Sequence, residues 1–307
     1  MQIIEVLFPV LAMMLIGAMC RRMKLIGTEG IENLKFLVTR ILLPVAIFHA
    51  LATAEYDHKT LLIVLVMFLM ILGTLGVGYL VKGLVKPPFR KYIPFMVSVY
   101  EGGMIGYPLY TNLCGVENLS KIAMLDIAGL LFGFSIYMGL LQQVEHEEKT
   151  EFKALLWDAV KNPAFIASVL GVIAGGTGVI KLLLDTGFGP TYLNVEGMIT
   201  APLTAMILLI VGYSLSPDLR YLKPCLQTVG LRVVVQGVFM VPVLFIAGKL
   251  FPGDTLILYA IVSYMSAPAT FSMQSFLKTE EGSAYAATTN SLYVIVSILV
   301  YTVMAGL

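Results

Sequence analysis

The residues best suited to chemistry in this chain lie at two interruptions of long apolar stretches. The first interruption is Glu101-Gly102-Gly103, within residues 92–113, and the second is centred on Pro268, within residues 255–277. At about 1.5 Å per residue, Glu101 lies roughly 14 Å and Pro268 roughly 18 Å along a helix, close to the centre of a bilayer. Free backbone groups at that depth are tolerated only where they line a protein cavity or bind something.

Each interruption would create a half-helix whose N-terminal N–H groups point inwards with about half a positive charge. If the two stretches run antiparallel, these N-termini, near Met104 and Ala269, face one central point. That point would attract a carboxylate, while the carbonyl ends of the preceding half-helices could hold a cation. A kink without function is the alternative for Pro268 alone, but its pairing with Gly102-Gly103 favours a binding site.

Two acidic residues inside apolar stretches are the candidates for coupling to an ion. A carboxylate near the midplane is costly unless it is protonated, paired or ligating, so Glu101 could carry a proton, bind Na⁺ or contact a substrate. Its alternative role is to cap the half-helix that begins at Gly103. Asp126 lies roughly 10 Å below the outer surface and could partner Glu101 or bind the ion. For Asp126 the alternative is a hydrogen bond to a neighbouring helix.

Other polar residues in the apolar stretches carry weaker signals. Hydroxyl and amide side chains such as Gln236 and Asn290 most often join neighbouring helices, and a minority would touch a ligand. Arg40 and Arg232 fall near the inner ends of their stretches, so we expect them to reach the membrane interface.

Composition identifies the environment of these residues. The chain has 307 residues, of which 58% are hydrophobic and 13% charged, and its mean hydropathy is +0.89. Soluble domains contain roughly 45–50% apolar residues and cannot bury this much apolar surface. A net charge of +1 gives no indication of a nucleic-acid partner, and the three cysteines form no CxxC pair. The sequence therefore predicts an all-α integral membrane protein in the lipid bilayer, with no cofactor and no metal.

Ten stretches are long enough to cross the bilayer, which needs about 20 apolar residues per crossing. Arg21, Arg22 and Lys24 follow the first stretch, and most basic residues fall in connectors that are then on the inner side. By the positive-inside rule we expect both termini on the outer side of the plasma membrane. The predicted stretches are 3–20, 36–54, 61–82, 92–113, 119–141, 159–182, 193–215, 226–250, 255–277 and 284–306.

The two halves of the chain match one another weakly. Pro9 and Gly17 align with Pro163 and Gly171, and the second stretch of each half contains one proline, at Pro44 and Pro202. The fourth and ninth stretches both begin with Val-Ser. Because each half has an odd number of spans, the halves must have opposite topology, as in many secondary transporters. The predicted units are 1–141, a cytoplasmic linker 142–158, and 159–307, forming two inverted five-helix repeats.

These features, with the segment Gly103-Met-Ile-Gly-Tyr-Pro-Leu109, resemble the auxin efflux carrier family over the whole chain. That family includes plant PIN-type carriers and bacterial members thought to move malate or malonate, and it is distantly similar to the bile acid:sodium symporters. The resemblance implies that the first, second, sixth and seventh helices form a scaffold, with a homodimer through the second and seventh. It also implies that the fourth and ninth helices cross at the substrate site. The implied substrate-binding residues are Tyr100, Glu101, Gly102, Gly103, Ser266, Ala267, Pro268 and Thr270.

One residue departs from the family pattern, because Glu101 stands where the family has Asn. A fixed negative charge there would repel an anionic substrate at close range. The expectation is an alternating-access carrier of a small organic anion such as a dicarboxylate, with H⁺ or Na⁺ coupled through Glu101 and Asp126. The alternative is a carrier of a neutral or cationic solute whose charge Glu101 balances. A membrane enzyme would need a nucleophile–base pair or a metal cluster, and a channel or sensor is the remaining class.

Overall fold

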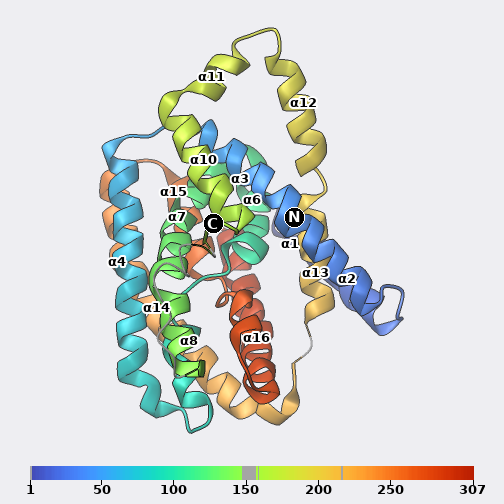
Figure 1. Ribbon diagram of the computed structural model, residues 1–307, viewed down its shortest axis with the longest axis vertical. Helices are drawn as coiled ribbons and strands as arrows, with labels where there is room; N and C mark the ends of the chain where they lie inside the picture. Colours follow the sequence, from blue (N-terminus) through green and yellow to red (C-terminus); the bar gives the residue numbers. More distant parts are fainter. Residues whose placement is uncertain (1, 147–156, 158, 216) are drawn as a thin grey trace.

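The computed structural model describes residues 2–146, 157, 159–215 and 217–307 (Figure 1). Every regular element within these residues is helical. Most of the predicted linker 142–158 lies outside the described residues. The principal helices are α1 (Gln2–Arg22), α2 (Thr28–Leu37), η1 (Val38–Leu42), α3 (Leu43–Ala52), α4 (His58–Val81), α5 (Ile93–Met96), η4 (Gly102–Gly106), α6 (Tyr107–Cys114), α7 (Leu119–Phe132), η6 (Gly133–Tyr137), α8 (Met138–His146), α10 (Pro163–Thr177), α11 (Val179–Leu184), α12 (Gly189–Thr200), α13 (Leu203–Ser214), α14 (Leu222–Leu250), α15 (Thr255–Met265), η8 (Phe271–Phe276) and α16 (Glu280–Met304).

Seven helical segments of the described chain are long and apolar enough to cross a membrane. The apolar helices α10 and α15 are shorter than these, and the stretch 92–113 is divided between short helices. The all-helical, multi-span prediction is thus supported, while the count of ten spans stays a prediction. The seven segments are Ile4–Arg22, Thr28–Ala52, His58–Leu84, Val116–Glu145, Gly189–Ser214, Leu219–Leu250 and Glu280–Met304.

Two helix pairs pack through glycine. In the first pair, α1 lies against α13, and a Cβ on Gly17 would overlap the carbonyl oxygen of Leu209. In the second pair, α3 lies against α10, and a Cβ on Gly171 would be 2.9 Å from the Cβ of Leu51. Only a residue without a side chain allows backbones to approach this closely. Gly17 and Gly171 are also the glycines that the sequence comparison of the two halves aligns.

A second group of helices packs around α14, which contacts α4, α15 and α16, while α7 contacts α4 and α15 (Figure 1). The two groups meet where α3 contacts α7 and where α13 contacts α6 and η4. In Figure 1, α11 and α12 form a hairpin at the top of the view, beyond the rest of the bundle. The broken segments that contain Glu101 and Pro268 lie within the second group.

Both predicted interruptions are present, but the first covers residues 97–101 rather than Glu101-Gly102-Gly103. In the first, α5 ends at Met96 and regular helix resumes only at η4, one residue after Glu101. In the second, α15 ends at Met265 and η8 begins at Phe271. Pro268 cannot donate a backbone hydrogen bond, which explains the second break. In the first, Gly102 and Gly103 lie at the start of the helix that follows the break rather than within it.

Candidate functional site

The two interruptions meet in space and are joined through their backbones. The N–H of Glu101 donates a hydrogen bond of 2.8 Å to the carbonyl oxygen of Pro268. Beside this bond, the rings of Tyr100 and Tyr264 lie 4.8 Å apart between centroids. The segments around Glu101 and Pro268 therefore form one crossing, as the sequence pattern predicts.

The Glu101 side chain makes its capping hydrogen bond to the opposite half-helix. Its Oε2 accepts a hydrogen bond of 2.7 Å from the N–H of Phe271, the first residue of η8. The carboxylate interacts more weakly with the N–H of Met104, in the helix that starts at Gly102, where no capping hydrogen bond forms. The expectation that Glu101 caps the Gly103 half-helix is met only by this weaker interaction, because the crossing also brings the start of η8 within reach of the carboxylate. A negative side chain at a helix start satisfies free N–H groups and the helix dipole.

Asp126 on α7 is buried and links both broken stretches. Its Oδ2 accepts a hydrogen bond of 2.7 Å from the hydroxyl of Tyr107 on α6, and its Oδ1 accepts one of 2.7 Å from Tyr264 on α15. The carboxyl group also lies directly against Gly102, where an added Cβ would be 2.9 Å from it. The expected hydrogen bond to a neighbouring helix is present, and it places Asp126 next to the crossing.

Arg232 lies in the interior, not at the membrane interface. It is 1% exposed and donates to three carbonyl oxygens: Met96 at 2.6 Å, Val99 at 2.8 Å and Ala267 at 2.8 Å. The expectation that it reaches the interface is therefore wrong. Arg232 lies almost three turns beyond the start of α14 at Leu222, which is deep enough to meet carbonyls that the two breaks release from helix.

Gln236, one turn beyond Arg232, also joins α14 to the first interruption. Its Nε2 donates to the carbonyl oxygen of Val97 at 2.6 Å, and its Oε1 accepts from the hydroxyl of Tyr100 at 2.6 Å. Sequence reasoning assigned such amides to the joining of helices, and Gln236 does this at the crossing itself.

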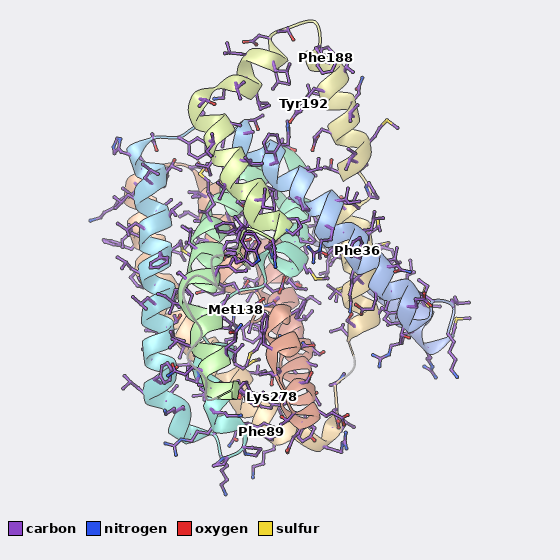
Figure 2. The ribbon with its side chains drawn as sticks, in the orientation of Figure 1. Phe36, Phe89, Met138, Phe188, Tyr192 and Lys278 are labelled. Atoms are coloured by element: carbon purple, nitrogen blue, oxygen red, sulfur yellow. The ribbon has the colours of Figure 1, made fainter. Side chains whose placement is uncertain are left out.

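A cavity of about 770 Å³ opens onto the crossing. Of the predicted substrate-binding residues, those that line it are Tyr100, Glu101, Gly102, Gly103 and Thr270, together with the predicted ion-coupling residue Asp126. By contrast, Ser266, Ala267 and Pro268 are buried and do not line it. Sidewalls come from α2 and α8, whose Phe36 and Met138 are labelled in Figure 2. Lys35 and Arg40 add positive charge to the lining. The size of the cavity suits a small molecule.

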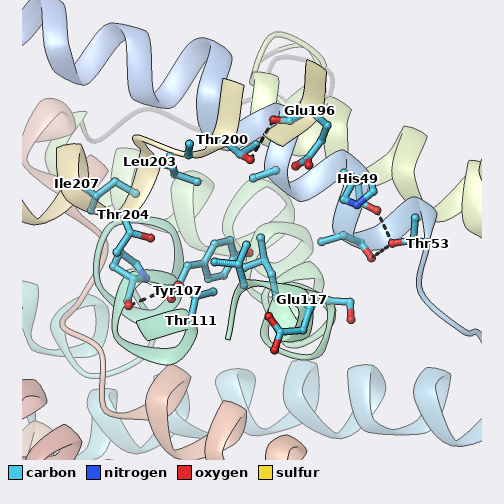
Figure 3. Close-up of a pocket in the computed structure, with 17 residues that line it drawn as sticks. His49, Thr53, Tyr107, Thr111, Glu117, Glu196, Thr200, Leu203, Thr204 and Ile207 are labelled. Carbon is cyan, nitrogen blue, oxygen red and sulfur yellow. Dashed lines mark hydrogen bonds between the residues drawn. The ribbon is translucent and has the colours of Figure 1, made fainter. Parts of the chain in front are cut away.

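A second cavity of about 290 Å³ has Tyr107 in its wall (Figure 3). Its lining includes His49 from α3, Thr204 from α13 and Tyr107 from α6. Tyr107 lines this cavity and Asp126 lines the larger one, and their hydrogen bond joins the two linings. This hydrogen bond therefore connects the walls of the two cavities next to the crossing.

Comparison with known proteins identifies the class to which this geometry belongs. A protein-family model described as "Membrane transport protein" matches residues 2–305. The chain belongs to this family. It is also 27% identical over 221 residues to an uncharacterized transporter of Methanocaldococcus jannaschii, a match that covers 69% of each chain. The resemblance to auxin efflux carriers is confirmed, and the protein is a membrane transporter rather than an enzyme.

Sequence reasoning missed three groups that build the site. Tyr107 and Tyr264 were not singled out, although each is a polar side chain within an apolar stretch, as Asp126 is. Arg232 was assigned to the interface, although it lies inside a long apolar helix, and a charge in such a place is the same signal that identifies Glu101. If an arginine inside an apolar helix had been treated like the glutamate, Arg232 would have been identified as a site residue as well.

Proposed function

We propose that this protein is a secondary active transporter that moves a small organic acid, such as a dicarboxylate, across the plasma membrane by alternating access. The observation that carries the proposal is the pair of cavities whose linings are joined by the Tyr107–Asp126 hydrogen bond at the crossing. A carrier must bind its cargo at a point that each side can reach in turn. The side-chain contact between the cavities is a natural barrier for that alternation.

Two features support an organic acid as the cargo. The larger cavity exposes the start of the helix at Gly102, where main-chain dipoles favour negative charge. Arg40 lines the same cavity, as does Lys35, whose charge Glu32 partly balances, and the two basic side chains would attract an anion toward it. A dicarboxylate could thus place one carboxylate near the helix start and the other toward the basic side chains.

Glu101 is the proposed coupling residue. Its carboxylate lines the cavity and bonds to Phe271, so a bound anion would meet a negative charge at close range. Protonation of Glu101, or a cation beside it, would remove this repulsion. Cargo binding would then be linked to H⁺ or Na⁺, with Asp126 as the second acidic group near the same point.

The proposed alternation uses two inverted five-helix repeats, 1–141 and 159–307, with ten spans and both termini outside. The support is that Gly17 and Gly171, which align in sequence, occupy matching places in the pairs α1–α13 and α10–α3. These four helices would form the scaffold, and a homodimer would use the second and seventh spans. The remaining helices would move relative to the scaffold and carry the crossing with them.

The second candidate function is transport of a neutral or cationic solute. The observation that favours it is that three carboxylates, Glu32, Glu101 and Asp126, line the larger cavity. In this case Glu101 would balance the charge of the cargo rather than repel it.

Currents from purified protein in liposomes on a solid-supported membrane distinguish these functions. Concentration jumps of malate, malonate, indole acetate and a cationic solute are applied to wild type and Glu101→Gln, at several pH values and with or without Na⁺. The proposal predicts a saturable acid-evoked current whose pH or Na⁺ dependence is lost in the variant. A current with the cation alone supports the second function, and an acid current unchanged in the variant removes Glu101 from coupling.

A further inference from the structure

We propose that Arg232 is the resident cation of the crossing, occupying the place that a coupling Na⁺ would need, so that cargo moves without Na⁺. The inference rests on the proposed transport function and decides between its two coupling ions. It also assigns a role to a buried charge that the organic-acid site itself does not use.

The carbonyl groups that Arg232 binds come from both broken stretches. Met96 ends α5, and Val99 follows it within the first interruption. Ala267 follows α15 within the second interruption. Carbonyl oxygens at helix ends carry the negative pole of the helix, and such oxygens are ligands that bind a cation in broken transporter helices.

The surroundings of Arg232 are those of a bound ion rather than of an ion pair. Within the described part of the chain, the five ion pairs do not include Arg232, so its charge faces main-chain oxygens instead of a carboxylate. The ring centroids of Tyr293 and Tyr100 lie 4.9 Å and 5.4 Å from its guanidinium carbon. These rings contribute further cation–π attraction.

Little room remains for a second cation. Arg232 is 1% exposed, and Gln236 takes up the neighbouring carbonyl oxygen of Val97 through its amide. A Na⁺ at the same oxygens would have to displace a covalently tethered guanidinium or approach it against like-charge repulsion. The acidic groups of the crossing have other partners, since Glu101 bonds to Phe271 and Asp126 bonds to two tyrosines.

A purely structural role for Arg232 predicts a different behaviour from an ionic one. If Arg232 only holds the two breaks together, its removal destabilises the protein in every salt. If it acts as the cation of a carbonyl site, removal leaves a site that a small free cation can fill. The distinguishing observation is rescue by an added cation.

The test measures cation binding directly and does not depend on knowing the cargo. Melting temperatures of the purified full-length protein are recorded in NaCl and in choline chloride of equal ionic strength, and with millimolar guanidinium. The variants are Arg232→Ala, which opens the site, and Arg232→Lys, which keeps the charge. Wild type and Arg232→Lys should show no Na⁺-specific shift. Arg232→Ala should rise by about 2–4 °C when guanidinium or Na⁺ reaches about ten times its dissociation constant.

Two results would overturn the proposal. One is a Na⁺-specific rise in the melting temperature of wild type, which needs no variant to fold. The other is an Arg232→Ala protein that folds but responds equally to all salts. Acid-evoked currents in liposomes then separate this failure from failure of the transport proposal, because Na⁺-dependent currents refute only the role of Arg232. The absence of any acid current refutes the organic-acid function and leaves the cation-binding result standing.

Discussion

The two broken segments of the crossing lie in similar places, but the helix starts that follow the two breaks have different hydrogen-bond partners. The break in 92–113 is followed by glycine, and the helix after it starts at Gly102 without a capping hydrogen bond from a side chain and lines the cavity. The break in 255–277 is made by proline, and the helix start that follows is capped by Glu101 from the other segment. One helix start therefore faces the cavity, while the other is held by the protein's own carboxylate.

This difference indicates where cargo should bind. A capped start has its N–H group and its positive pole satisfied, whereas a start that faces a cavity keeps both for a ligand. The glycine break should thus be the binding end of the crossing and the proline break its fixed end. Substitutions on the two sides should differ in what they damage.

The largest expected effect is at Gly102. A Cβ there would be 2.9 Å from the Asp126 carboxyl group, so Gly102→Ala must displace either the carboxyl group or the break. Overpacking of this kind typically costs about 1–3 kcal/mol, and we expect loss of acid-evoked current by more than tenfold. The matched control is Gly133→Ala, because Gly133 also lines the cavity but an added Cβ meets nothing within 4 Å. Equal losses in both variants would refute the special role of Gly102.

The two tyrosines that bind Asp126 provide the next comparison. Tyr107→Phe and Tyr264→Phe each remove one hydrogen bond to the same carboxyl group. Such a bond is worth about 1.5–3 kcal/mol if the carboxyl group is charged, and both variants should lower the melting temperature by similar amounts. Only Tyr107 lines the second cavity, so Tyr107→Phe should also reduce the current, by roughly tenfold. Equal currents in the two variants would show that the Tyr107 contact is not the barrier.

Removal of the Glu101 cap should affect stability as well as transport. Glu101→Ala leaves the N–H of Phe271 without its carboxylate. Loss of such a cap costs about 0.5–2 kcal/mol. The melting temperature of purified protein should fall, and Glu101→Gln should fall less because its amide oxygen can still accept the hydrogen bond. A Glu101→Ala protein as stable as wild type would contradict the assignment of the proline side as the fixed end.

The smallest expected effect is at the cavity lining farther from the crossing. Lys35 is partly exposed and pairs with Glu32 at 2.7 Å. Its charge is therefore screened by water and by its partner. Lys35→Gln should raise the half-saturating acid concentration by about twofold, less at high salt. Glu32→Gln should shift it in the opposite direction. A reduction of the acid-evoked current as large as that expected for Gly102→Ala would show that the cargo binds at the basic side chains instead.

Local chemistry explains which parts of this account the sequence could predict. The break at Pro268 was predictable because proline disturbs a helix by its own backbone properties, wherever the helix lies. The first break was predictable only in its approximate place, because the glycines that mark it begin the next helix. The partner of Glu101 was not, since Phe271 is 170 residues away and its position depends on the crossing itself.

The partners of Arg232 were also not predictable from the sequence. Its ligands are carbonyl oxygens, which every residue possesses, so no side-chain pattern marks them in the sequence. Its depth within α14 was the available signal, and the apolar stretch 226–250 began too close to it for that depth to be recognised. The full helix starts at Leu222, and the added turn moves Arg232 inward.

The most direct test of the central claim is the accessibility of the two cavities in the presence of cargo. Thr39 lines the larger cavity and Thr204 the smaller one. Each is replaced by Cys in a protein whose Cys20, Cys114 and Cys225 are changed to Ser, and the rate of thiol modification is measured with and without malate or malonate. Alternation about the crossing predicts that the acid changes the two rates in opposite directions. Rates that change together, or that the acids leave unaltered, would contradict the account.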